Sequence, residues 1–406
     1  MVAASACGIA IVAAACGGTS TNSPSSGGGA SIPSGLSVSS FDASFSIMSQ
    51  FKRLTAAGSG LVGVILPDTT SSTRYVNFDA PYLMKAFTEA GYNASDFKID
   101  NAQGNNATQL ALAKADITLG AKVLIFDPLD STVGAAIQSY AQSQGVATIS
   151  YDRATFQGTN TYYVSFDNVL VGKLIGKGFK SCVSSWSVSN PMVFTLNGGE
   201  DTDPNAISFA QGYNQEIWGT MTTPLPAGTT NSLGYTLVGD QITPGWTNQK
   251  GHDIFANQFT AHPNINATVE ANDGLANQVI QVLKGNNVPA KKIPTTGQDA
   301  TPDGMANTLL GWQCGSVYKA VYLEAQDAVA IATILRAGKT PPSALINSTT
   351  KPASGPGTEE PASLLTPVWV DSTNMASTVI KDKFVDATVL CAAVTAAVCS
   401  AAGITP

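Results

Sequence analysis

Charged residues and histidines are scarce in this chain, and their scarcity argues against two classes of function. Of the 406 residues, 12% are charged, the formal net charge is -7, and only two are histidines, His252 and His262. The sequence has no basic patch that could neutralise phosphate groups, so we expect no nucleic-acid partner. The histidines and cysteines lack the spacing of a zinc site, so we also expect no metal and no cofactor.

Sequence motifs of common enzymes are absent as well. There is no Gly-x-Ser-x-Gly motif and no helix with the paired histidines of a metalloprotease. Residues 172–177 resemble a phosphate-binding loop, but their spacing is one residue short and Gly178 replaces the hydroxyl residue. We therefore expect that the protein is not an enzyme and that these glycines allow close helix packing.

The apolar run near the start, Ile9 to Ala15, is too short to span a bilayer and resembles the apolar region of a secretory signal. Small residues before Cys16 and a polar stretch after it resemble a bacterial lipoprotein processing site. We expect residues 1–16 to be a signal peptide with lipidation at Cys16, and a plain cleaved signal is the alternative. Residues 17–57 are predicted to be a flexible tether because they begin with a Ser/Gly/Thr/Pro-rich stretch. The mature protein would then be extracytoplasmic, periplasmic or at the cell surface, and held to the membrane by lipid alone.

Four cysteines remain beyond this segment, and an even number in an exported protein suggests two disulfides. Cys391 and Cys399 are close enough in sequence for a local bridge. Cys182 and Cys314 would then pair by elimination. Free buried thiols are the alternative.

Apolar strands alternate with helices through most of the chain. The first strand, residues 61–66, is a continuous apolar run of the kind buried on both faces of a parallel sheet. The alternation runs to Tyr151, resumes after Ser165, and is followed by a second crossing near Val317. It predicts an α/β fold of two doubly wound parallel-sheet lobes joined by a multi-strand hinge around a cleft. The predicted boundaries are 58–164 with 317–347 for the N-terminal lobe, 165–316 with 348–390 for the C-terminal lobe, and 391–406 for a tail.

Polar or aromatic residues recur just after the apolar strands, where parallel sheets bind ligands. They are Arg74, Asp152, Arg153, Asp203, Asn205, Trp246, Asn272, Asp299 and Lys319. Together they suit a sugar, because carboxylates accept from hydroxyls, Arg and Lys donate to them, and an aromatic face covers the C–H face of a pyranose. Simpler interpretations exist: Trp246 could be a packed turn residue, and Lys319 could be an exposed residue at a helix start. Four members could merely cap helices, namely Asp203, Asn205, Asn272 and Asp299.

At these residues the sequence resembles the periplasmic D-xylose-binding proteins of bacterial ABC importers, within the ribose/galactose-binding superfamily of type I folds. The resemblance extends from about residue 61 to residue 384. Its motifs are YDR at 151–153, YYVSFDN at 162–168, NGG at 197–199, GDQ at 239–241, ANDG at 271–274, GQDA at 297–300, VYK at 317–319, LLTP at 364–367 and STVIKD at 377–382. It implies that the nine residues above contact a monosaccharide, D-xylose or a related aldopyranose. It also implies a monomer that delivers the sugar to an ABC importer permease.

The chain departs from the family pattern in the loop before Arg74, at Pro204, and in the lengths of the 190–241 and 340–363 blocks, so the identity of the sugar stays open. Two other functions also stay open. One is a sensory receptor that presents the sugar to a membrane signalling protein. The other is a glycoside-processing enzyme that uses Asp152, Asp203 or Asp299 as acid and base.

Overall fold

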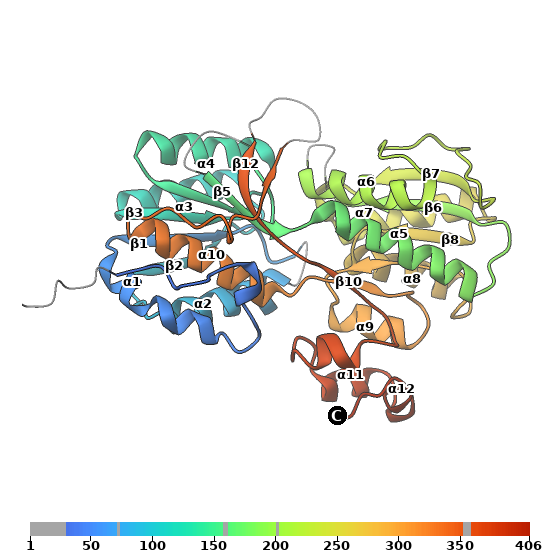
Figure 1. The fold of residues 1–406 in the computed structure, drawn as a ribbon. Helices are drawn as coiled ribbons and strands as arrows, with labels where there is room; N and C mark the ends of the chain where they lie inside the picture. Colours follow the sequence, from blue (N-terminus) through green and yellow to red (C-terminus); the bar gives the residue numbers. More distant parts are fainter. Residues whose placement is uncertain (1–29, 71–73, 157–160, 200–202, 352–358) are drawn as a thin grey trace, which may run out of the picture.

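Two α/β lobes lie side by side and are joined by chain crossings between them (Figure 1). The structure is a computed structural model that describes residues 30–70, 74–156, 161–199, 203–351 and 359–406. Cys16 and the proposed signal segment lie outside these residues. Among the helices of these ranges, none is both long and apolar enough for a membrane span.

The first lobe is built on a seven-stranded sheet of order β11-β12-β5-β4-β3-β1-β2. Its strands are β1 (Leu61–Leu66), β2 (Phe97–Asn101), β3 (Ala121–Phe126), β4 (Ala147–Tyr151), β5 (Thr161–Phe166), β11 (Ser348–Thr350) and β12 (Glu360–Leu365). All neighbouring strands are parallel except β11 and β12. Its helices are α1 (Lys52–Ala57), α2 (Ala80–Glu89), α3 (Asn106–Thr118), α4 (Ser131–Ser143) and α10 (Val321–Arg336).

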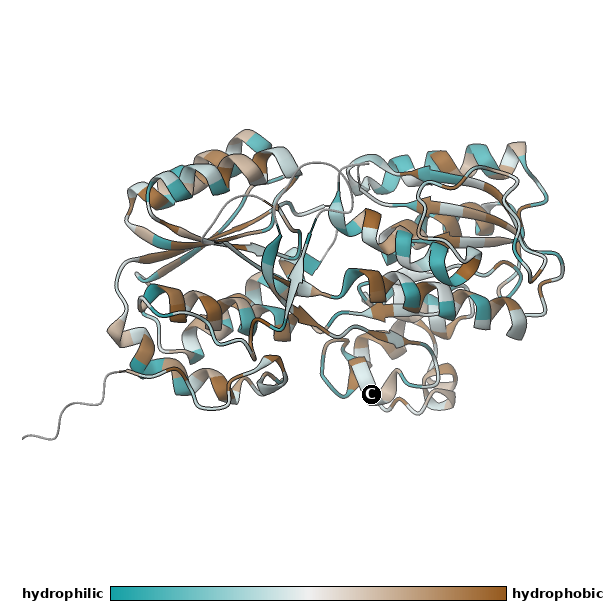
Figure 2. Ribbon diagram, turned by 45° about the horizontal axis from the view of Figure 1, so that its top comes forward, coloured by the Kyte–Doolittle hydropathy of each residue, from teal (hydrophilic) through white to brown (hydrophobic). Residues whose placement is uncertain are grey.

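The continuous apolar strands of this sheet contribute side chains to two hydrophobic cores, one on each face of the sheet. In β3, Val123 and Ile125 pack with α2 and α10 on one face. Leu124 and Phe126 pack with α3 and α4 on the other. Side chains of a strand alternate between faces, so a strand covered on both sides must be apolar throughout. Figure 2 shows these strands as apolar ribbons between helices of mixed hydropathy.

The second lobe contains a parallel sheet of order β7-β6-β8 and a mixed sheet of order β13-β10-β9. Its strands are β6 (Met192–Asn197), β7 (Thr236–Ile242), β8 (Ala267–Glu270), β9 (Gly297–Gln298), β10 (Ser316–Tyr318) and β13 (Val368–Val370). Its helices are α5 (Asn168–Ser185), α6 (Pro204–Trp218), α7 (Asn248–Ala261), α8 (Asp273–Gly285) and α9 (Pro302–Leu309). Two short helices, α11 (Ala387–Ala393) and α12 (Ala396–Ala401), form the C-terminal tail beside α9 (Figure 1).

A buried carboxyl group links the two sheets of the second lobe. The Glu270 side chain accepts a hydrogen bond from the backbone N–H of Thr296 at 2.7 Å, and the Thr296 hydroxyl accepts one from the Glu270 backbone N–H at 2.9 Å. In a regular sheet, backbone atoms of neighbouring strands would bond to each other at this point. Between β8 and β9, these two side chains make the bonds instead. Burial raises the pKa of Glu270 to about 8.

Helices α5 and α6 touch closely at the glycines of the segment that resembles a phosphate-binding loop. A Cβ on Gly172 would lie 2.1 Å from the Phe209 carbonyl oxygen, and one on Gly212 would lie 2.3 Å from that of Val169. These distances forbid any side chain at either position. The glycines therefore serve helix packing, as predicted, and they fix α6 at the distance that its cleft-facing residues require.

Three sequence-based boundaries are wrong. Strands β11 and β12 join the first lobe, although 348–390 was predicted for the second; Glu360 at the start of β12 is buried there, bonded to Gln138 and Thr155. The predicted strand from Leu364 to Val370 is two strands, one in each lobe. The predicted tether ends earlier than residue 57, because apolar residues between 36 and 54 pack into the first lobe's core.

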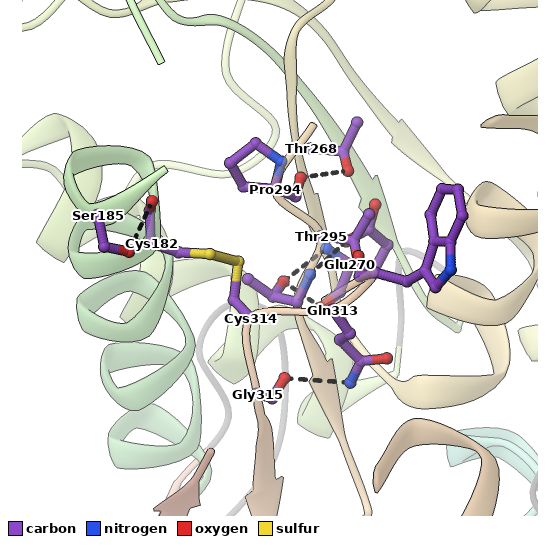
Figure 3. Close-up of a disulfide and its surroundings, with 11 residues drawn as sticks. Cys182, Ser185, Thr268, Glu270, Pro294, Thr295, Gln313, Cys314 and Gly315 are labelled. Carbon is purple, nitrogen blue, oxygen red and sulfur yellow. Dashed lines mark hydrogen bonds between the residues drawn. A yellow bond between two sulfur atoms is a disulfide. The ribbon is translucent and has the colours of Figure 1, made fainter. Parts of the chain in front are cut away.

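Both predicted disulfides are present. Cys182 in α5 is bonded to Cys314, two residues before β10, so the bridge ties the first helix of the second lobe to a strand that leads back to the first lobe (Figure 3). Cys391 and Cys399 are bonded between α11 and α12. Peptide mass mapping of the protein isolated without reductant should recover both linked pairs. Quantitative alkylation of all four thiols would contradict this arrangement.

A buried acid in α10 makes the first lobe sensitive to pH. Asp327 accepts a hydrogen bond from Ser363, and its other oxygen has no hydrogen-bond partner among the described residues. Burial raises the pKa of Asp327 to about 8. The unfolded chain releases this proton near pH 4, so the stability that the proton confers on the folded state falls as pH rises from about 4 to 8.

We expect Asp327→Asn, which keeps a neutral side chain at every pH, to flatten this dependence. Relative to wild type, it should gain about 2 kcal/mol in unfolding free energy between pH 6 and pH 8. Urea unfolding at both pH values measures the difference. Parallel pH profiles for the two proteins would mean that Asp327 is ionised in the fold.

Candidate functional site: a cavity between the lobes

The carboxyl ends of the parallel strands from both lobes face one cavity, called here the inner cavity. Eight of the nine predicted residues line it: Arg74, Asp152, Arg153, Asn205, Trp246, Asn272, Asp299 and Lys319. They come from loops after β1, β4, β7, β8, β9 and β10 and from the start of α6. The ninth, Asp203, lines an adjoining outer cavity of about 380 Å³.

Three further residues line the inner cavity and were missed from the sequence: Tyr75, Phe209 and Gln298. Tyr75 and Gln298 are direct neighbours of Arg74 and Asp299. Phe209 lies one helical turn after Asn205 in α6, on the same face. That spacing was the available signal, but it is also the spacing of an ordinary core residue.

Asp152 is the electrostatic centre of the first lobe's wall. It is 3% exposed, and its Oδ1 lies 3.0 Å from Arg74 Nη1 and 3.3 Å from Lys319 Nζ. Burial alone would raise the pKa of Asp152, but Arg74, Lys319 and Arg153 together hold it below its ordinary value. The carboxylate is therefore a permanently charged acceptor.

Arg74 is held by three carboxyl groups. Its Nε and Nη2 donate to the two oxygens of Asp79 at 2.9 and 2.8 Å, Nη2 also donates to Glu324 at 2.8 Å, and Nη1 reaches Asp152. Tyr151 donates to Asp79 at 2.7 Å and completes the group. Arg74 thus organises the wall as much as it lines the cavity.

Arg153 reaches from the first lobe towards the second. Its Nη1 lies 3.3 Å from Asp127 and its Nη2 donates to the Tyr75 hydroxyl at 3.1 Å. Its Nε lies 3.7 Å from Asp203 Oδ2, across the gap between the lobes. Arg153 also lines both cavities, so it forms part of their common border.

Trp246 and Phe209 form the aromatic wall of the second lobe. Their rings meet edge to face with centroids 6.4 Å apart. Trp246 Nε1 donates to Asp203 Oδ2 at 2.8 Å, which fixes the indole orientation. Gly198 leaves room for the ring, since a Cβ there would lie 1.9 Å from it.

Three residues of the site hold backbone conformations that disfavour side chains. The φ angles are +61° at Asp152, +55° at Trp246 and +90° at Asp299. Non-glycine residues with positive φ cost free energy and cluster at functional sites. Their occurrence at three cavity-lining positions supports a functional role for this cavity.

The helix-cap interpretation is correct for two of four residues. Asp203 Oδ1 accepts from the first turn of α6, and Asn272 Oδ1 accepts from Leu275 in α8. Asn205 lies inside α6, and α9 is capped by Thr301 instead of Asp299. Asn272 is buried, and it both caps α8 and lines the inner cavity.

The lobes touch around the inner cavity. Asn205 Nδ2 of the second lobe donates to the Asp152 carbonyl oxygen of the first at 2.9 Å, and Tyr163 also donates to that oxygen, at 2.8 Å. In this closed arrangement the inner cavity measures only about 30 Å³. A ring-sized ligand would have to enter while the lobes are further apart.

No group of three or more histidine, cysteine, aspartate or glutamate side chains within the described ranges could hold a metal ion. The cavity offers carboxylates, amides, cations and aromatic faces. This is the chemistry that recognises a neutral polyhydroxylated molecule, since each hydroxyl both donates and accepts.

Comparison with known proteins agrees with this geometry. A family model described as a periplasmic binding protein domain matches residues 62–340. The D-xylose-binding periplasmic protein of Escherichia coli (strain K12) is 31% identical over 288 residues, covering 70% of this chain and 80% of that protein. The multiple sugar-binding periplasmic receptor ChvE of Rhizobium radiobacter is 27% identical, with coverage of 80% and 91%.

Solved structures share the fold. A carbohydrate transporter solute binding protein from Chloroflexus aurantiacus, in complex with D-glucose, has a TM-score of 0.68 at 23% identity and covers 82% of this chain and 98% of its own. A Caulobacter myo-inositol binding protein has a TM-score of 0.62 at 20% identity, with coverage of 79% and 96%. With two α/β lobes of type I architecture around a cleft, this chain belongs to the periplasmic binding protein family.

Proposed function

We propose that this protein captures a monosaccharide, D-xylose or a related aldopyranose, in the inner cavity and delivers it to the permease of an ABC importer. The observation that carries the proposal is the convergence of eight predicted residues, from both lobes, on one buried cavity. Relatives whose names state D-xylose or several sugars add support. We further propose that the protein is an extracytoplasmic monomer anchored by lipid at Cys16.

The wall chemistry suggests a division of roles. Asp152 and Asp299 accept from sugar hydroxyls, Arg153 and Lys319 donate, and amides such as Asn272 do both. Trp246 covers an apolar face of the ring. Binding to residues of both lobes favours the closed state, because the ligand contacts each lobe fully only when they meet.

The same fold could serve a sensor, with an identical cavity and a signalling protein in place of the permease. A pull-down of membrane proteins with and without sugar separates these two partners. A glycoside-processing enzyme would need an acid and a base in the cavity. The pKa of Asp152 is held low by its cationic neighbours, which disfavours this residue as the acid. We therefore propose binding without turnover.

A thermal-shift panel over pentoses and hexoses tests the proposal, because a ligand that binds only the folded state stabilises it. We expect D-xylose or a close relative to raise the melting temperature by several degrees. Chromatography of the same mixtures should return the sugar unchanged. A panel without any shift would contradict the proposal.

Closure makes a separate prediction. If the crossings near Ser165 and Val317 act as hinges, the ligand-free protein samples wider arrangements than the bound one. Small-angle scattering should then give a smaller radius of gyration at saturating sugar. An unchanged profile with a sugar that demonstrably binds would indicate a rigid cleft.

A further inference from the structure

The outer cavity is adjacent to the inner one and much larger. Its volume of about 380 Å³ falls within the roughly 300–1,000 Å³ of ligand pockets. Arg153 and Trp246 line both cavities, so the two border each other there. The outer cavity is present while Asn205 and Asp152 hold the lobes in contact. A molecule held in the inner cavity would therefore find space for a substituent on this side, even with the lobes closed.

The walls of the outer cavity combine apolar and hydrogen-bonding surfaces. Pro128 and Leu129 line it from the first lobe, and Pro204 lines it from the second. The Trp246 indole stands at the border. Rigid apolar groups of this kind suit the C–H faces of a sugar ring and lose little conformational entropy on binding.

One polar group of this wall is fixed in advance. Asp130 Oδ1 accepts from the backbone N–H groups of Thr132 at 2.8 Å and Val133 at 2.9 Å, where it caps α4. Asn106, at the start of α3, donates to its other oxygen. Both residues line the outer cavity and neither lines the inner one. They offer acceptors and donors for hydroxyl groups without further ordering of the chain.

We propose that the outer cavity binds a second, neutral sugar residue, so that the protein accepts disaccharides or glycosides whose first ring fills the inner cavity. The proposal rests on the proposed function and extends its ligand class. Among the residues that the structure describes, three carboxylates line the outer cavity, Asp68, Asp130 and Asp203, against one cation, Arg153. This balance disfavours an anionic second unit such as a uronate.

Calorimetric titration with matched ligands tests the proposal. The probes are D-xylose and D-glucose, and their disaccharides β-1,4-xylobiose, cellobiose and maltose. We expect at least one disaccharide to bind within about tenfold of its monosaccharide. Asn106→Trp should fill the outer cavity from an exposed helix start and weaken that disaccharide by tenfold or more, with the monosaccharide affinity changed less than about twofold.

Thr108→Trp is the matched control, because it adds the same ring at an exposed position of α3 that lines neither cavity. It should leave both affinities unchanged. If monosaccharides bind and every disaccharide fails, the outer cavity is not a sugar site and only this proposal falls. The same conclusion follows if Asn106→Trp leaves disaccharide affinity unchanged or weakens both ligands equally. If no sugar binds at all, the proposed function fails with it.

Discussion

Replacing Trp246 with alanine should weaken monosaccharide binding by roughly tenfold to a hundredfold, equivalent to about 1–3 kcal/mol. The indole is one of the aromatic surfaces of the inner cavity, and Asp203 and Phe209 hold its orientation. Its loss would remove the face that covers the sugar's C–H groups. Titration calorimetry of the variant against wild type measures the change.

Matched variants separate binding from folding. Trp246→Phe keeps an aromatic face and loses the bond to Asp203, so its affinity should lie between those of wild type and alanine. Trp312→Ala removes a partly buried tryptophan of the second lobe that lines neither cavity, and its affinity should be unchanged. Asp299→Asn keeps the shape of a cavity-lining acceptor and loses its charge, so binding should weaken while folding survives. Wild-type affinity in both Trp246→Ala and Asp299→Asn would contradict the placement of the sugar.

Replacing Arg74 with alanine should lower the free energy of unfolding by about 3–5 kcal/mol near neutral pH. The substitution removes the cation that contacts Asp79, Asp152 and Glu324 together, and it leaves their carboxyl groups buried. Denaturant unfolding with and without sugar measures the effect. The loss should shrink as pH falls, because protonation of the Asp152 carboxyl group removes its charge.

Glu324→Gln is the control for this prediction. Burial raises the pKa of Glu324 to about 8, even though Arg74 lowers it, so the side chain is largely protonated at pH 7. The amide replaces a neutral acid and can still accept from Arg74, so we expect a change below about 1 kcal/mol. A large loss in Glu324→Gln would mean that the pair is ionised. A small loss in Arg74→Ala would mean that the three carboxyl groups tolerate each other without a cation.

The fold could be predicted because its signals are local. The apolar run of β1 and the regular alternation of strands and helices require sheets covered on both faces, and loops after parallel strands meet at one edge. The cavity residues follow from that rule. It also explains why Asp203, which follows a strand like the other residues, was grouped with them. Asp203 caps α6 and lies just outside the inner cavity.

What the sequence did not reveal depends on contacts between distant segments. The pairing of β12 with β5 is accompanied by a buried hydrogen bond between Glu360 and Gln138, which are 222 residues apart. Phe209 lines the cavity because Gly172 lets α6 approach α5, and a phenylalanine in a helix gives no local sign of this. The three carboxyl groups around Arg74 likewise join α10 to a loop that is distant in sequence.

Titration calorimetry of the wild-type protein with D-xylose, and with D-glucose and L-arabinose as competitors, shows whether the inner cavity binds an aldopyranose. We expect saturable binding of at least one of these sugars with about one site per chain and micromolar or tighter affinity, near -8 kcal/mol or below. Trp246→Ala should lower that affinity. Absence of saturable binding for all three sugars, in protein shown to be folded by a cooperative melt, would contradict the assignment of the inner cavity to an aldopyranose.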